Sequence, residues 1–221
     1  MVKEPRKKGT EEETKGTKEK IRDVAIDLFS LKGYNAVSVR DIARLVNIHE
    51  SSIYSHYKGK EDIMDSIISY LIEETKSSST PVPLDQLLEK YEPEILLDNA
   101  IRPMIEQLKA PTLRKILRLM WIELYQNDKF LDFFKNQFIE PSYVLWTSVF
   151  QKMMDIGYII EYDAKVLAHE FFNYCIYLFF EGFILNYDES NYNDVIDTLN
   201  TKLSDHIKFI LDMVKKNRFQ K

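Results

Sequence analysis

The stretch Val39–Tyr57, with the sequence VRDIARLVNIHESSIYSHY, predicts two short helices that cross closely. Ala43 provides the small side chain that a close crossing needs. Asn47 stands at the turn between the helices, where a positive φ is needed that asparagine tolerates better than most residues. The apolar residues expected to point inward are Ile42, Val46, Ile48 and Ile53. This arrangement is the sequence form of a helix-turn-helix.

The second of these helices is polar for its position. In residues 50–60, ESSIYSHYKGK, only Ile53 and Tyr57 look suited to a core, and serines, a histidine and a glutamate fill most of the rest. A helix this short and polar, placed between two strongly amphipathic segments, is explained if its outer face enters the major groove of DNA instead of packing on a core.

The flanking segments predict two longer helices. Upstream, the apolar spacing i, i+3, i+4, i+7, i+8 predicts a core-facing helix that Thr17 caps and Gly33 ends. The apolar residues with this spacing are Ile21, Val24, Ala25, Leu28 and Phe29. Ser38 is expected to cap the first helix of the pair, and Leu45 to point inward. Downstream, a helix over 60–75 carries two adjacent apolar stripes, which makes it a candidate connector.

Between Ile21 and Ile63 the chain resembles the TetR family of transcriptional regulators. The matching residues are Ile21–Phe29, Gly33-Tyr34, Ser38–Ala43, Ile53-Tyr54, His56-Tyr57 and Lys60–Ile63. The long first helix and the Tyr-x-His-Tyr-Lys-x-Lys sequel are more specific than a generic helix-turn-helix. The resemblance implies an N-terminal DNA-binding domain, and a C-terminal domain that forms a homodimer and holds a small effector.

The resemblance also implies roles for individual residues. Those expected near base edges or phosphates are Ser51, Ser52 and Ser55, and those expected to contact the DNA backbone are Thr17, Ser38, Arg40, Tyr54, His56 and Lys60. Lys60 begins the next helix, so its charge and the helix dipole would both favour a phosphate.

Glu50 departs from the family pattern. Where His49 and Glu50 stand, the family commonly has serine followed by lysine or arginine. An acid at the mouth of the groove repels phosphate, unless its carboxylate accepts a hydrogen bond from N4 of a cytosine. Glu50 is thus expected either to select a C·G pair or to weaken binding to non-specific DNA. We favour the second role, because the serines beside Glu50 include no arginine to hold its side chain.

The whole chain predicts an all-α fold of about nine or ten helices, because β-branched alternation is scarce. Residues 1–13 are expected to form a disordered tail. Residues 14–75 are expected to form the DNA-binding domain, with its helix-turn-helix at about 37–57. Residues 76–221 are expected to form an effector-binding and dimerisation domain, and the Ser/Pro-rich run 76–83 marks the boundary. Further helices are expected near 84–91, 94–108, 111–126, 128–156, 163–186 and 192–216.

The segment 113–154 is rich in aromatic residues and methionines. Most of them are expected in the core, but a bundle lined in this way can hold an apolar or aromatic ligand. The candidate effector-binding residues are Trp121, Glu123, Tyr125, Trp146, Phe150, His169, Asn173 and Tyr177.

The helices expected near 163–186 and 192–216 carry more apolar residues than one small bundle needs. Among these residues are Phe172, Phe183, Leu203 and Ile207. Two such pairs of helices would form a four-helix interface, so a homodimer is expected.

Charge is distributed unevenly along the chain. The net charge is −5, yet residues 1–60 hold 13 Lys/Arg and 9 Asp/Glu, whereas residues 61–221 hold 17 and 26. A basic N-terminal part on an acidic body is expected when only one end meets a polyanion such as double-stranded DNA.

Other classes of function find no support in the sequence. The four histidines are scattered and Cys175 is the single cysteine, so no catalytic constellation, disulfide, metal or other cofactor is expected. The start of the chain lacks the apolar region of a signal peptide, and the most apolar run, residues 171–185, is shorter than the about 20 residues that span a bilayer. We therefore expect a cytoplasmic protein that is not an enzyme and does not enter a membrane.

Together with the resemblance, these patterns predict a homodimeric DNA-binding regulator. The function most common in the family is a repressor that a small apolar or aromatic effector releases from a palindromic operator. The alternative is a helical ligand-binding or protein-interaction module whose DNA binding is weak or lost, which Glu50 and the acidic body favour.

Overall fold

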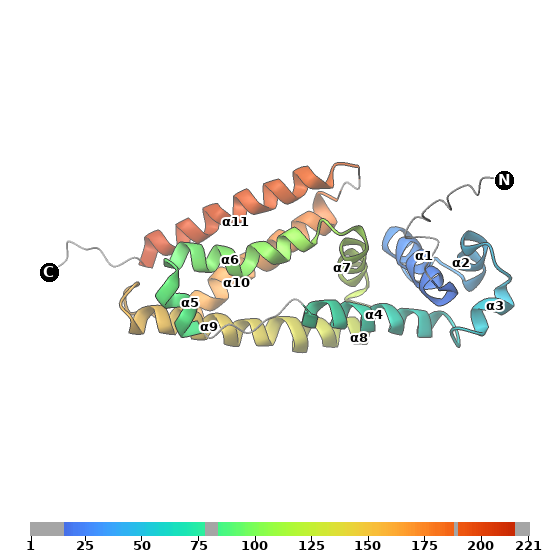
Figure 1. Cartoon of the computed structure of the whole chain (residues 1–221), viewed down its shortest axis with the longest axis horizontal. Helices are drawn as coiled ribbons and strands as arrows, with labels where there is room; N and C mark the ends of the chain where they lie inside the picture. Colours follow the sequence, from blue (N-terminus) through green and yellow to red (C-terminus); the bar gives the residue numbers. More distant parts are fainter. Residues whose placement is uncertain (1–15, 78–83, 188–189, 215–221) are drawn as a thin grey trace, which may run out of the picture. The chain divides into compact units, whose positions relative to one another are not determined.

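The chain folds as an assembly of helices (Figure 1). The computed structural model describes residues 16–77, 84–187 and 190–214. Within these ranges there is no β-strand, and the predicted all-α fold is confirmed. The predicted tail over 1–13 lies outside the described residues, as do residues 78–83 of the Ser/Pro-rich segment.

The chain divides into two compact units, residues 1–73 and 74–221. The sequence predicted a domain boundary after residue 75. The elements that begin in the first unit are α1 (Thr17–Lys32), α2 (Val39–Val46), α3 (Glu50–Tyr54) and α4 (Lys60–Ser77). Helix α4 continues without a break across residue 73, so its last turn, from residue 74 onward, belongs to the second unit.

An apolar core holds the first unit together. Its largest fully buried side chains are Ile21, Ile26, Phe29, Ile42, Ile53, Ile63 and Met64. Tyr57 is also buried, and its hydroxyl donates a hydrogen bond to the carbonyl oxygen of Lys18 at 3.1 Å. The prediction for Leu45 is wrong, since this side chain is 58% exposed. The eight-residue helix α2 buries only one narrow face, which is formed by Ile42 and Ala43.

Local side-chain contacts set both ends of α2. The Ser38 hydroxyl accepts a hydrogen bond from the backbone N–H of Asp41 at 3.1 Å, and the Asp41 carboxylate accepts one from the backbone N–H of Ser38 at 3.0 Å. The Ser38 hydroxyl also donates to the Asp41 carboxylate at 2.6 Å, and this bond, together with the one from the Ser38 N–H, lowers the pKa of Asp41 below its usual value. Asn47 ends the helix with a φ of 60°, in the left-handed region that the sequence predicted.

Helix α1 begins one residue away from the predicted cap. Gly16, not Thr17, occupies the cap position, because the Glu19 side chain reaches back and accepts a hydrogen bond from the Gly16 N–H at 3.3 Å. Thr17 is the first helical residue. The predicted end is confirmed, since Gly33 follows the helix with a φ of 80°.

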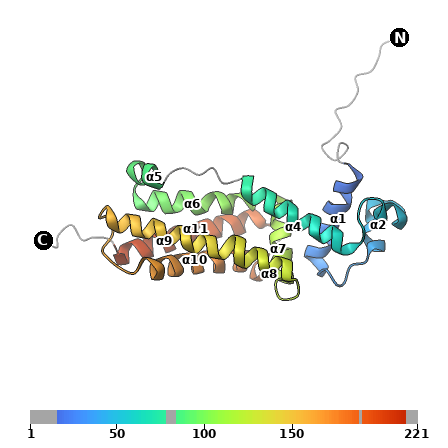
Figure 2. The ribbon, with the colours of Figure 1, turned by 90° about the horizontal axis from the view of Figure 1, so that it is seen from below.

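The second unit is a helical bundle. Its elements are α5 (Leu84–Lys90), α6 (Pro93–Gln107), α7 (Pro111–Glu123), α8 (Asp128–Asp132), η2 (Phe133–Ile139), α9 (Glu140–Asp155), α10 (Ala164–Phe180), η3 (Glu181–Leu185) and α11 (Tyr192–Val214). Figures 1 and 2 show α6, α9, α10 and α11 alongside one another, with α7 across one end of this group. The sequence predicted uninterrupted helices over 128–156 and 163–186, but η2 and η3 are π-helices. Such wide turns often mark functional sites.

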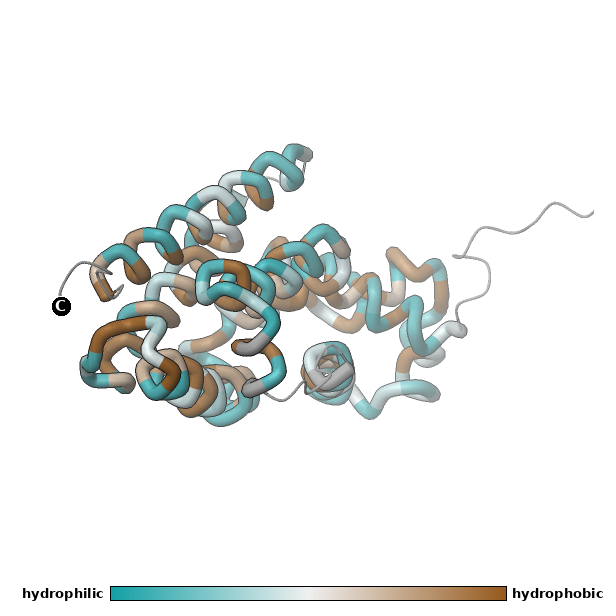
Figure 3. The backbone as a smooth tube through the Cα atoms, turned by 60° about the vertical axis from the view of Figure 1, so that its left-hand side comes forward, coloured by the Kyte–Doolittle hydropathy of each residue, from teal (hydrophilic) through white to brown (hydrophobic). Residues whose placement is uncertain are grey.

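Aromatic side chains fill the core of this bundle, and hydrophobic residues recur along each of its long helices (Figure 3). Phe171 packs edge-on against Trp146 and Phe150, with ring centroids 4.6 and 5.8 Å away. The His206 ring stacks on Phe171, and its Nε2 lies 3.1 Å from the Phe171 carbonyl oxygen. Burial lowers the pKa of His206 and raises that of the Cys175 thiol to about 12.

The apolar residues that were expected to form a dimer surface lie in this core. Phe172, Phe183, Leu203 and Ile207 are all buried within the unit, because α10 and α11 pack on their own neighbours. The large apolar side chains that α10 and α11 do expose are Val166, Tyr177, Phe209 and Met213.

Candidate DNA-binding surface and effector cavity

Helix α3 presents a polar face to solvent. Ser51, Tyr54 and Ser55 are exposed, and so is His56, which follows the helix. Tyr54 is 54% exposed although its ring is largely apolar. The half-buried Ser52 uses its carbonyl oxygen to accept a hydrogen bond from the Ser55 hydroxyl at 2.7 Å. These five predicted DNA-binding residues therefore lie together on α3 and the two residues that follow it.

Glu50 begins α3 and pairs with Arg40 of α2. The distance from Arg40 Nε to Glu50 Oε2 is 3.4 Å. The side chain of Arg40 is 85% exposed and that of Glu50 is 40% exposed. The interpretation that no arginine holds Glu50 is wrong, because the crossing of the two helices joins residues that are ten apart in the sequence. A crossing of this kind cannot be seen from neighbouring residues.

The other predicted DNA contacts of this region lie on α1 and at the start of α2. Thr17 is exposed at the first position of α1. Ser38 is exposed as well, but its hydroxyl donates to the Asp41 carboxylate at 2.6 Å and so serves the helix cap. Arg44, which the sequence did not single out, is exposed and pairs with Asp41 at 3.0 Å.

Lys60 has a structural role that the sequence did not reveal. Its ammonium donates hydrogen bonds to the carbonyl oxygens of Tyr34 and Val37, at 2.8 and 2.9 Å. It also lies 4.1 Å from the centre of the Tyr34 ring, which is a cation–π distance. The side chain thus closes the loop between α1 and α2. Its contact with phosphate stays a prediction.

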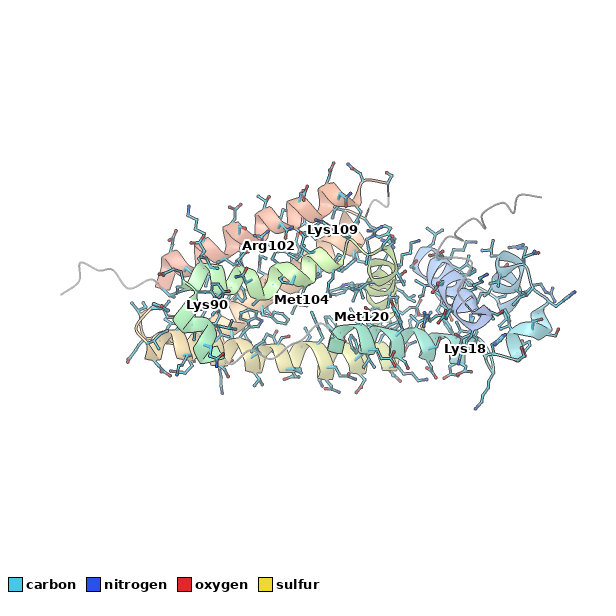
Figure 4. The ribbon with its side chains drawn as sticks, viewed as in Figure 1. Lys18, Lys90, Arg102, Met104, Lys109 and Met120 are labelled. Carbon is cyan, nitrogen blue, oxygen red and sulfur yellow. The ribbon has the colours of Figure 1, made fainter. Side chains whose placement is uncertain are left out.

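A cavity of about 60 Å³ lies inside the second unit. Its lining residues are Thr75, Met104, Gln107, Leu108, Leu113, Leu117, Met120, Trp121, Phe133, Phe134, Phe138, Phe179 and Phe183. None of these side chains is charged, and both π-helices contribute to the lining. Figure 4 labels two of the flexible lining residues, Met104 on α6 and Met120 on α7. The site suits an uncharged apolar or aromatic molecule.

The structure does not bring the eight predicted effector-binding residues together. Trp121 lines the cavity, where its ring meets Phe134 edge-on at 5.2 Å. The others lie elsewhere: Trp146 and Phe150 in the core, Glu123 buried on α7, Tyr125 and Tyr177 exposed, and His169 and Asn173 against Tyr143. The segment 113–154 supplies seven of the thirteen lining residues, but its sequence does not show which side of each helix faces the cavity.

Charged side chains tie the π-helix η3 to its neighbours. Arg118 of α7 donates a hydrogen bond to the carbonyl oxygen of Phe183 at 2.6 Å, and its guanidinium lies 4.0 Å from the centre of the Tyr187 ring. The buried Glu181 of η3 pairs with Lys202 of α11. The π-helix η3, which supplies Phe183 to the cavity wall, is therefore joined to α7 by a hydrogen bond and to α11 by an ion pair.

Within residues 16–77, 84–187 and 190–214, no three His, Cys, Asp or Glu side chains are grouped so that they could hold a metal ion. None of the described helices is long and apolar enough to cross a membrane.

Residues 21–67 match the family model for bacterial regulatory proteins of the tetR family. In this segment the chain has the sequence of a tetR-family regulator. A stretch of 60 residues, 25% of this chain, is 43% identical to IcaR of Staphylococcus epidermidis, the negative transcriptional regulator of the biofilm operon icaADBC. That stretch covers 32% of IcaR, so the chain spans about a third of the length of the curated relatives it matches.

Solved structures share the fold over most of the chain. A bacterial regulatory protein in the tetR family from Rhodococcus RHA1 has a TM-score of 0.62 at 16% identity, over 92% of this chain and 100% of that one. SmeT, solved as a complex with triclosan, has a TM-score of 0.59 at 16% identity, over 92% of this chain and 94% of that one. At such identities the likeness concerns the fold.

Proposed function

We propose that this TetR-family chain is a sequence-specific DNA-binding regulator, and that it represses transcription until a small apolar or aromatic effector releases it from a palindromic operator. The observation that carries the proposal is the exposed polar face of α3 in a helix-turn-helix of the TetR type. Serine and tyrosine hydroxyls and the imidazole of His56 both donate and accept hydrogen bonds, so they suit base edges and phosphates. Such a function also implies a cytoplasmic protein.

Repression, rather than activation, is supported by relatives that share the DNA-binding stretch. IcaR is a negative transcriptional regulator. A repressor needs only to occupy its operator, whereas an activator must also present a surface to the transcription machinery.

The effector is expected in the cavity of the second unit. At about 60 Å³ the cavity is far smaller than the roughly 300–1,000 Å³ of typical ligand sites, so a ligand must widen it. Met104 and Met120 allow such widening, because a methionine side chain has three rotatable bonds. Thr75 also lines the cavity from the last turn of α4, so widening at this point would displace α4. The SmeT–triclosan complex supports small-molecule binding in this fold.

A homodimer follows from the same proposal, since a palindromic operator mirrors the two-fold axis of its protein. The exposed apolar residues Val166, Tyr177, Phe209 and Met213 are the candidate contacts on α10 and α11. Light scattering is expected to give about twice the chain mass of 26.2 kDa. Phe209→Glu should shift the protein to the monomer, whereas a wild-type monomer at micromolar concentration would rule out the dimer and the palindrome together.

The proposal is tested by selecting bound sequences from a random DNA pool with the full chain. We expect a palindrome whose half-sites lie about 34–36 Å apart, so that two recognition helices enter successive major grooves. Tyr54→Phe should weaken binding to all sequences alike, because the hydroxyl is expected to contact the backbone. DNA affinity near background at low salt would instead favour the helical ligand-binding or protein-interaction module.

A further inference from the structure

Glu50 occupies the position in α3 from which a side chain first reaches the proposed DNA surface. It is the first residue of the helix, and its neighbours Ser51 and Ser55 are exposed. The partial positive charge of a helix N-terminus favours an acid there. A free carboxylate beside phosphates is nevertheless unfavourable, because like charges repel over the about 8–10 Å of a Debye length.

The contact with Arg40 changes this balance. The Arg40–Glu50 pair at 3.4 Å has no net charge, so the repulsion between Glu50 and nearby phosphates is largely cancelled. The pair is exposed and its worth in stability is small, about 0–1 kcal/mol. Its consequence is geometric instead: a tethered carboxylate samples fewer positions than a glutamate that extends freely into water.

Hydrogen-bonding groups remain unused on this exposed pair. Only Oε2 of Glu50 and Nε of Arg40 are engaged, and in the described part of the chain Oε1 of Glu50 and the terminal nitrogens of Arg40 have no hydrogen-bond partner. Oε1 is a pure acceptor and so needs a donor from the DNA. In the major groove the donors are N4 of cytosine and N6 of adenine. Adenine places the acceptor N7 beside N6, which repels a carboxylate, so cytosine is the better partner.

We propose that Glu50 selects a cytosine in each operator half-site and that Arg40 is the residue that positions its carboxylate. This inference rests on the proposed DNA-binding function and names the base that the surface reads. Arg40 has a second task in the same complex: its outward nitrogens donate to a backbone phosphate and so fix the pair against the DNA.

The test is selection from a random DNA pool with the full chain and three variants. Wild type is expected to enrich one C·G pair at a fixed position in each half-site. Glu50→Gln should lose that preference or shift it to A·T, since glutamine pairs with adenine N6 and N7, and should bind the wild-type operator about 10- to 100-fold more weakly. Arg40→Met should weaken the preference for C·G at the same position, while thermal stability stays unchanged. Arg44→Ala is the matched control, because Arg44 is an exposed cation of α2 that pairs with Asp41 and not with Glu50.

Each outcome separates the inference from the function on which it rests. If wild type enriches no sequence at all, sequence-specific DNA binding fails. If wild type and Glu50→Gln enrich the same motif with equal affinity, the role of Glu50 fails while the function stands. Tighter binding of Glu50→Gln to every sequence, most visible at low salt, would mean that Glu50 only repels phosphate, and this also overturns the inference. If Arg40→Met shows the same preference for C·G as wild type, Arg40 is not the positioning residue.

Discussion

The two units of this chain organise their candidate sites in opposite ways. In the first unit the polar residues of one five-residue helix, α3, point outward, and each lies within a few residues of the others in the sequence. In the second unit an apolar cavity is lined from α4, α6, α7, η2, α10 and η3, whose lining residues extend from Thr75 to Phe183. A local surface can be read from adjacent residues, whereas a cavity depends on how distant helices are rotated.

The largest effect on stability is expected when a buried phenylalanine is truncated in the core of either unit. Phe29 in the first unit and Phe171 in the second are both fully buried, so Phe29→Ala and Phe171→Ala should each cost about 3–5 kcal/mol. Both tryptophans, Trp121 and Trp146, belong to the second unit. If the units unfold separately, Phe171→Ala will lower the midpoint seen by tryptophan fluorescence, and Phe29→Ala will lower only that of a separate transition in circular dichroism.

The control for this comparison is Leu31→Ala, on the same helix as Phe29. Leu31 is 72% exposed, so its truncation should change stability by less than about 0.5 kcal/mol. If Phe29→Ala and Phe171→Ala lower both midpoints by the same amount, the two units unfold as one, and the contrast between them does not extend to stability.

Lys60 is expected to contribute both to the stability of the first unit and to the proposed DNA surface, so one substitution can measure the two effects separately. Lys60→Ala removes the donor to the carbonyl oxygens of Tyr34 and Val37, and should cost about 1–3 kcal/mol of stability. It should also reduce the slope of log affinity against log salt by about one unit. Lys58→Ala, an exposed lysine two residues earlier, should leave stability unchanged. An unchanged slope in Lys60→Ala would leave this residue with its structural role only.

Ligand binding tests whether the two sites are linked. An apolar aromatic compound that binds the cavity should lower DNA affinity by about 5- to 150-fold, which corresponds to a coupling of about 1–3 kcal/mol. The compound should change tryptophan fluorescence through Trp121, so Trp121→Phe should lose this signal and Trp146→Phe should keep it. A compound that binds tightly through Trp121 but leaves operator affinity unchanged would show that the two sites are independent.

The smallest effect is a pH dependence confined to the second unit. Burial lowers the pKa of His206 below the roughly 6.5 of an unfolded histidine. As the pH falls, the unfolded state therefore takes up a proton before the folded state does. The free energy of unfolding is unaffected by protonation of His206 above about pH 6.5 and decreases as the pH falls below that value. The slope should not exceed about 1.4 kcal/mol per pH unit. Unfolding of wild type and His206→Phe between pH 5 and 8 measures the difference, and equal slopes would contradict it.

The sequence was informative where a structural feature depends on neighbouring residues. Ser38 and Asp41 are three apart and cap α2, and Asn47 adopts the positive φ that its turn needs. Ile42 and Ile53 are buried because helical spacing places them on the same face as their neighbours. The TetR pattern extends the same local information over the whole helix-turn-helix.

Features that depend on distant residues could not be predicted in this way. The Arg40–Glu50 pair requires the crossing of two helices, and the bonds from Lys60 to Tyr34 and Val37 join residues more than twenty apart. The π-helices, which supply Phe133, Phe134, Phe138 and Phe183 to the cavity lining, follow no simple spacing rule in the sequence. Trp121 on α7 lines the cavity, whereas Tyr125, which follows the end of that helix, is 96% exposed.

The burial of Cys175 makes the chain convenient to label. The thiol is 1% exposed and its pKa is raised to about 12, so at pH 7–8 almost none of it is the thiolate that reacts with maleimides. The native cysteine can therefore stay in place while a single new thiol is introduced on the surface, for example by Lys32→Cys. Each protomer would then carry one fluorophore at a known position, and the separation of two DNA-binding units could be followed by energy transfer as effector is added.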